Sequence, residues 1–188
     1  TSLYYSLIYP YLIYGIVIWG HAYKSVLTPL FILQKKAIRL MTFSHYYNHS
    51  TPLFLRLRIL KLEDLVYLHT SLFMYDFHEN NLPSIFNNFF VSVKQRHSYN
   101  TRLASKSSYS LPKVRTNYGL LNIKFVGAKI WNSIDESLKK LSRDNFIKSL
   151  YANVLKTYIW IPSVILSEIL LKLYCLKLYI VYIYFKIM

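Results

Sequence analysis

Acidic residues are scarce in this 188-residue sequence, which has eight Asp and Glu side chains against 23 Lys and Arg. The formal net charge of +15 therefore favours partners that carry negative charge. A single cysteine, Cys175, excludes an intramolecular disulfide framework and a thiolate-rich zinc site. Because a lone thiol fits a reducing compartment, we expect an intracellular protein, nuclear or cytoplasmic, with a membrane location as the alternative.

The sequence also lacks the motifs of common enzymes and metal sites. It has no phosphate-binding loop, no GxSxG motif and no adjacent aspartates that could hold two magnesium ions. The four-residue spacing of His45 and His49 would place two imidazoles on one helix face, but no HExxH glutamate lies between them. We therefore expect a protein that is not an enzyme and that holds no metal and no cofactor.

The most informative feature of the sequence is a basic block at residues 94–134, which lies in an acid-free stretch between Glu79 and Asp135. Its cations are Lys94, Arg96, Arg102, Lys106, Lys113, Arg115, Lys124 and Lys129, and its interleaved aromatics include Tyr99, Tyr109, Tyr118, Phe125 and Trp131. Like charges repel one another, so such a block is typical of a surface that binds nucleic acid, where rings stack on unpaired bases. The alternative interpretation is a solvated basic loop with buried aromatics.

The charge divides the chain into three segments. Residues 1–90 carry a net +3, residues 91–156 carry +10 from thirteen basic and three acidic residues, and residues 157–188 carry +2. We expect a helical bundle over 1–90, a basic and partly irregular extension with little β structure over 91–156, and an apolar low-complexity tail over 157–188. We interpret the tail as read-through of AT-rich DNA, with a membrane-associated segment as the alternative. Because the chain begins with Thr1, we expect it to be a fragment of a longer product or to come from an incomplete gene model.

Hydrophobic periodicity predicts a mainly α fold. Residues 1–23 are uncharged and long enough to cross a bilayer, but Pro10 and Gly15 interrupt them and favour a kinked, buried helix. Further helices are expected over 25–42 with Ser25 as the cap, from Thr51-Pro52 onward, and over 62–78, 125–138 and 143–155. A short strand is expected over 121–124 after a turn at Gly119.

The helix over 25–42 is expected to be amphipathic. Its apolar side comprises Leu27, Leu30, Phe31, Leu33, Ala37, Ile38 and Met41. A basic stripe of Lys35, Lys36 and Arg39 lies opposite. We expect Ile16 and Trp19 to pack on the apolar side.

Three sequence segments carry a family resemblance. They are LYYSLIYPYLIYG at 3–15 with Trp19-Gly20, LQKKAIR at 33–39, and RHSYNTR at 96–102 followed by GAKIWNSI at 127–134. In this order they resemble the region C-terminal to the catalytic palm in reverse transcriptases of LINE-type, non-LTR retrotransposons. The resemblance covers residues 3–155, and Ile134-Asp135 stands where the family often has Leu-Pro.

The resemblance implies a helical thumb and a basic C-terminal extension of a polymerase that copies RNA into DNA. The implied partners are RNA, RNA–DNA hybrid and the upstream palm and fingers of the parent polymerase. The catalytic carboxylates of the palm are absent from this sequence, so no catalytic residue is carried over. The alternatives are a small membrane protein with terminal apolar anchors and a domesticated protein-interaction module.

The basic block and the family resemblance together predict two sets of functional residues. The predicted nucleic-acid-binding residues are Lys35, Lys36, Arg39, Arg96, Tyr99, Arg102, Lys106, Lys113, Arg115, Lys124 and Lys129. The predicted structural residues of the motifs are Trp19, Gln34, Gly127, Trp131 and Asn132.

Overall fold

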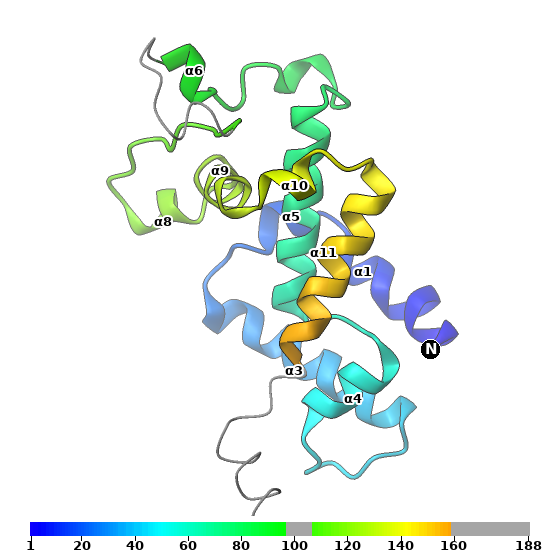
Figure 1. The fold of residues 1–188 in the computed structure, drawn as a ribbon. Coiled ribbons are helices and arrows are strands. Elements are labelled where there is room, and N and C mark those ends of the chain that lie inside the picture. Colours follow the sequence, from blue (N-terminus) through cyan, green and yellow to red (C-terminus); the bar gives the residue numbers. More distant parts are fainter. Residues whose placement is uncertain (97–106, 159–188) are drawn as a thin grey trace, which may run out of the picture.

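The computed structural model describes residues 1–96 and 107–158, and in these ranges the chain is mainly helical, as predicted (Figure 1). In chain order the elements are the π-helix η1 (Tyr4–Ile8), α1 (Tyr9–Ile13), α2 (Ile16–Trp19), α3 (Lys24–Met41), α4 (Ser50–Leu57), α5 (Leu62–His78), the 3₁₀ helix η2 (Ser84–Phe86), α6 (Val93–Arg96), α8 (Asn117–Leu120), α9 (Ile123–Ser133), α10 (Glu136–Lys139) and α11 (Arg143–Tyr158). Among the described residues, the β structure is one antiparallel bridge between Ser92 and Tyr109.

Helix α5 is the centre of the fold, and its predicted bounds, 62–78, are confirmed. The acidic pair Glu63 and Asp64 lies in its first turn, where the helix dipole favours negative charge. Other helices cover it on several sides, with α9, α11 and α2 as its main neighbours (Figure 1). Its buried residues are accordingly spread around the helix: Leu62, Leu65, Val66, Leu68, Thr70, Ser71, Met74 and Tyr75.

The segment after residue 90 packs on the same core as the segment before it. On α11, Phe146 is fully buried and stacks on Tyr75 of α5, with ring centroids 4.7 Å apart. Helix α9 crosses α5 so closely that a Cβ at Gly127 would lie 2.9 Å from Sδ of Met74. One hydrophobic cluster therefore extends from Tyr4 in η1 to α11.

Helix α3 is held to this core by a buried glutamine. Gln34 is 2% exposed; its Nε2 donates to the Tyr4 hydroxyl at 2.9 Å and to the Leu60 carbonyl at 3.0 Å. Its Oε1 accepts from the Leu62 amide at 3.0 Å, which joins η1, α3 and the start of α5. Because Gln34 and Ile38 face inward, Leu33 turns outward and is 59% exposed, so its predicted burial is wrong.

Two predicted helix starts are also displaced. Helix α3 begins at Lys24 with Tyr23 at its N-cap, so Ser25 lies inside the first turn and is not the cap. Helix α4 begins at Ser50 with His49 at its N-cap, and Pro52 occupies the first turn. Pro52 is tolerated there because the first-turn N–H groups have no partner within the helix.

The single kinked helix predicted over 1–23 is wrong, because the chain breaks at Gly15 into short helices. Gly15 adopts a left-handed conformation with φ +62°, which favours glycine. Across the break, Trp19 Nε1 donates to the Tyr14 carbonyl at 2.6 Å. Helix α2 packs mainly on α5 rather than on α3, and a Cβ at Gly20 would lie 2.6 Å from Val66. Among the described residues, no helix combines the length and apolar character that crossing a bilayer requires.

The strand predicted over 121–124 is wrong as well. Leu121 is the C-cap of α8, and Ile123 begins α9. The Asn122 side chain caps α9 by accepting from the Lys124 amide at 2.9 Å. The helix predicted over 125–138 ends at Ser133, and the short α10 follows. Helix α11 begins at Arg143 as predicted. Its apolar spacing predicts that Phe146, Ile147, Leu150 and Val154 face the core, and all of these but Ile147, which is half-buried, are buried.

Candidate nucleic-acid interface

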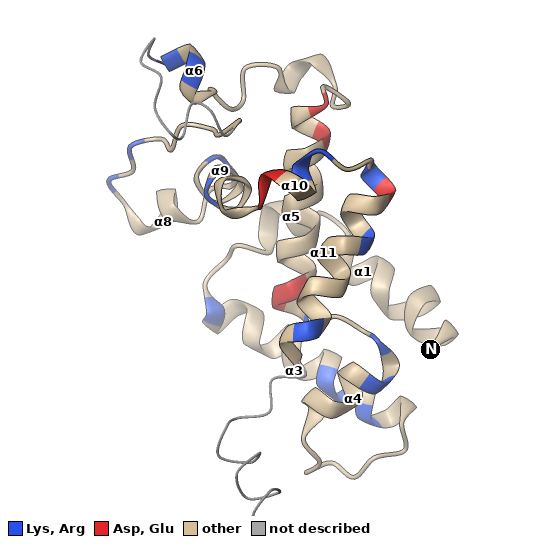
Figure 2. Cartoon of the chain, viewed as in Figure 1, with Lys and Arg blue, Asp and Glu red and all other residues tan. Residues whose placement is uncertain are grey.

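The predicted binding residues that the structure describes fall on two separate surfaces (Figure 2). The α6–α9 surface lies toward the C-terminal end of α5 and comprises Lys94, Arg96, Lys113, Arg115, Lys124 and Lys129, all exposed. The α3 surface lies toward the N-terminal end of α5 and comprises Lys35, Lys36 and Arg39. The predicted Tyr99, Arg102 and Lys106 lie outside the described residues.

The α6–α9 surface is assembled from three elements. Arg96 at the end of α6 donates from Nη1 to the Ser110 hydroxyl at 2.7 Å, which links α6 to the extended segment 107–110. Lys124 on α9 places its ammonium 4.5 Å from the ring centroid of Phe89. This cation–π contact positions the ammonium at the surface without neutralising it.

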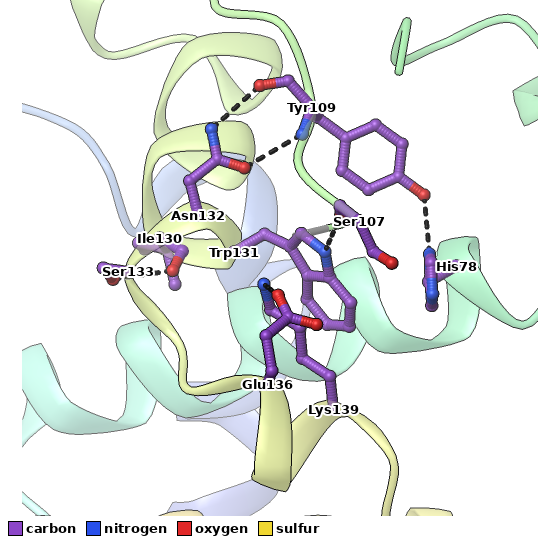
Figure 3. A network of polar contacts seen from close by, with 9 residues as sticks. All are labelled: His78, Ser107, Tyr109, Ile130, Trp131, Asn132, Ser133, Glu136 and Lys139. Atoms are coloured by element: carbon purple, nitrogen blue, oxygen red, sulfur yellow. Dashed lines mark hydrogen bonds and ion pairs between the residues drawn. The ribbon is translucent and has the colours of Figure 1, made fainter. Parts of the chain in front are cut away.

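The motif residues Trp131 and Asn132 fix the extended segment 107–110 against α9 (Figure 3). Asn132 Oδ1 accepts from the Tyr109 amide at 2.9 Å, while its Nδ2 donates to the Tyr109 carbonyl at 2.8 Å. Trp131 is fully buried and donates from Nε1 to the Ser107 carbonyl at 3.1 Å. These hydrogen bonds therefore hold the backbone of Ser107 and Tyr109 against α9.

Tyr109 and Trp131 also connect this segment to α5. The Tyr109 hydroxyl lies 3.1 Å from Nδ1 of His78, and the His78 ring lies 5.1 Å from that of Trp131 (Figure 3). Burial raises the pKa of Tyr109 to about 12, so its phenol stays neutral at physiological pH. Tyr109 and Trp131 therefore join the described part of the α6–α9 surface to α5. Because both rings are buried, the expectation that they stack on unpaired bases is wrong.

Lys139 of the basic extension faces inward and is removed from any interface. Its ammonium lies 2.8 Å from a carboxylate oxygen of Glu136 and 5.2 Å from the ring centroid of Trp131, and the residue is 5% exposed (Figure 3). A paired and buried cation does not meet a phosphate.

The α3 surface contains an open groove of about 490 Å³. Its lining residues are Lys36, Ala37, Arg39, Leu40, Ser44 and Tyr46. Arg39 donates from Nε to the Asn48 carbonyl at 3.0 Å, and its guanidinium carbon lies 5.8 Å from the ring centroid of Tyr46. The terminal guanidinium nitrogens have no acceptor among the described residues, so they remain available to an external anion.

The aromatic loop, residues 43–47, follows α3 and was not predicted as part of the site. Phe43, Tyr46 and Tyr47 are 97%, 62% and 84% exposed. The signal in the sequence is the run FSHYY, which begins four residues after Arg39, the last cation of the basic stripe. Exposed rings next to exposed cations are the combination that grips single-stranded nucleic acid.

A second cavity, of about 390 Å³, lies between α5, α10 and α11. Its lining is acidic, whereas that of the α3 groove is basic. Asp64 and Asp135 both line it, so it is unsuited to phosphate. The Tyr158 hydroxyl donates to the Asp64 carboxylate, and burial raises the pKa of that carboxyl. Elsewhere in the described residues, no three His, Cys, Asp or Glu side chains gather to form a metal site.

Comparisons with protein-family models, curated proteins and solved structures gave no match to this chain.

Proposed function

We propose that this chain is a nucleic-acid-binding segment of a LINE-type reverse transcriptase, from the region C-terminal to the palm. Its ligands are RNA or an RNA–DNA template-primer, and its protein partner is the upstream palm and fingers. One observation carries the proposal: the cations of both surfaces lack carboxylate partners among the described residues. Within residues 1–96 and 107–158, the ion pairs are Lys139–Glu136 and Arg143–Asp76.

Uncompensated cations on a folded surface repel one another and weaken folding, and a phosphate backbone relieves this repulsion. The two surfaces carry nine such side chains from α3, α6, α9 and the segment before α8. Their separation along α5 suits an extended polyanion better than a small anionic ligand.

The family assignment is supported by what the motif residues do. Gln34 joins three parts of the bundle, Gly127 permits the close crossing of α9 and α5, and Asn132 fixes the extended segment. Each motif residue thus has a structural task that a change of residue type would disturb. Such structural roles are what we expect of motif residues that maintain the fold common to a family.

Charge reversal tests the proposal on the full chain. We would measure the affinity for labelled RNA and for RNA–DNA hybrid in the wild type and in Lys124→Glu/Lys129→Glu. The control is Lys148→Glu/Lys156→Glu, which makes the same charge change at two exposed positions of α11. Loss of two phosphate contacts should weaken binding about tenfold or more at low salt, and the control should lose much less. Equal losses in the two variants would show only a response to net charge and would contradict the proposed interface.

A further inference from the structure

The first residue of the aromatic loop occupies a position that normally belongs to glycine. The Ser44 amide donates to the Arg39 carbonyl at 3.0 Å and the Phe43 amide to the Leu40 carbonyl at 3.2 Å, which is the Schellman arrangement of a helix end. Phe43 takes the left-handed position in this arrangement, with φ +50°. An L-residue with a Cβ is strained there, and glycine is not.

The Phe43 side chain contributes nothing to folding that would offset this strain. The Phe43 side chain is 97% exposed, so it gains almost nothing from burial. Strained residues concentrate at functional sites, and neighbouring exposed apolar rings mark binding surfaces. The ring of Phe43 is therefore best explained by a ligand.

The other rings of the loop contact one another beside the groove, which Tyr46 lines. The rings of His45 and Tyr47 are 5.3 Å apart and tilted by 33°, and the Tyr46 ring meets that of Tyr47 edge-on at 5.4 Å. The Arg39 guanidinium follows at the Tyr46 ring. These contacts lead from the exposed Tyr47 ring, through Tyr46, to the Arg39 guanidinium at the end of α3, whose terminal nitrogens have no acceptor among the described residues.

We propose that the aromatic loop and the α3 groove bind unpaired nucleotides, with bases stacking on Phe43 and Tyr47 and phosphates meeting Lys36 and Arg39. This inference rests on the proposed function and deepens it by naming a single-stranded ligand, either RNA or DNA. Duplex bases cover one another's faces and cannot stack on a protein ring, so the loop discriminates against duplex.

The decisive variant is Phe43→Gly in the full chain. Glycine removes the ring and the backbone strain together, so the melting temperature should stay equal or rise while single-strand affinity falls about fivefold or more. The second variant, Tyr47→Ala, should also weaken single-strand binding, and Tyr47→Phe, which keeps the ring, should restore it. The matched control is Tyr14→Ala, which removes a ring with 85% exposure on the N-terminal segment.

The ligands are short single strands of RNA and of DNA that carry a fluorescent base analogue, and a duplex of equal length. Quenching of the analogue on binding, reduced in Phe43→Gly, is the stacking signal that a purely structural role would not produce. Comparison of the RNA and DNA arms shows which strand the site accepts.

Four results would overturn the inference. They are unchanged single-strand affinity in both loop variants, equal losses for single strand and duplex, an equal loss in Tyr14→Ala, and a lower melting temperature for Phe43→Gly. Unchanged affinity would overturn the inference and leave the proposed function standing. Absence of binding by the wild type to any of the ligands would overturn the inference and the proposed function together.

Discussion

Replacing Gln34 with leucine tests whether the buried glutamine holds the helices together. Leucine is similar in size, so the change removes hydrogen bonds and leaves little cavity. The Leu60 carbonyl and the Leu62 amide, both on buried residues, would lose their side-chain partner, and the Tyr4 hydroxyl would lose its donor. At about 1–3 kcal/mol for each of these three groups, we expect a loss of about 3–9 kcal/mol in the free energy of unfolding.

Urea denaturation followed by circular dichroism measures this loss. Two partial variants separate the contributions. Tyr4→Phe removes one hydrogen bond and should cost about 1 kcal/mol, while Gln34→Glu keeps the acceptor for the Leu62 amide but loses both donors. If Gln34→Leu lost less than about 1 kcal/mol, the three contacts would not stabilise the fold and the reasoning would be refuted.

Three further predictions concern packing, pH and activity. Gly127→Ala should destabilise the fold by about 1–3 kcal/mol in thermal unfolding, because the new methyl group would lie 2.9 Å from Met74 and 3.3 Å from Phe90; a wild-type melting temperature would contradict the close crossing. Burial lowers the pKa of His21 and of His69 below the usual 6.5, so the unfolded chain binds more protons near that pH than the folded chain does. The free energy of unfolding should therefore fall as the pH drops through 6.5. The variant His21→Gln/His69→Gln should flatten this pH dependence, and an unchanged slope would contradict the role of the two histidines. The chain should incorporate no nucleotide on a primed RNA template with magnesium, because the sequence has no adjacent aspartates to hold the metal; incorporation above background would contradict this.

The helices with the clearest hydrophobic pattern were the most predictable from the sequence. Acidic residues at the start and apolar residues at helical spacing predicted the bounds of α5, and the spacing of Phe146, Leu150 and Val154 predicted the buried face of α11. The buried face of α3 was harder to predict, because its own apolar residues are spread around the helix and the polar Gln34 faces inward. The short run at 121–124 fits strand and helix alike, and the cap at Asn122 decided in favour of helix.

The candidate site was predictable in composition but not in arrangement. The sequence identifies the cations, but only the arrangement of the helices shows that Arg39 and Lys129 belong to different surfaces. It also shows that Lys139 is buried and paired with Glu136. The aromatic loop was missed because the end of α3 carries no glycine to mark it. Phe43 takes that position against local preference, so its conformation follows from the structure alone.

The salt dependence of single-stranded RNA binding by the full chain tests the central claim most directly. Each phosphate contact releases counterions, so the logarithm of the affinity should fall linearly with the logarithm of salt concentration, with a slope of about −0.7 per contact. For three or more contacts we predict a slope of about −2 or steeper, and a shallower slope in Lys124→Glu/Lys129→Glu. An affinity that stays constant between low and moderate salt would contradict the claim that these cations bind a phosphate backbone.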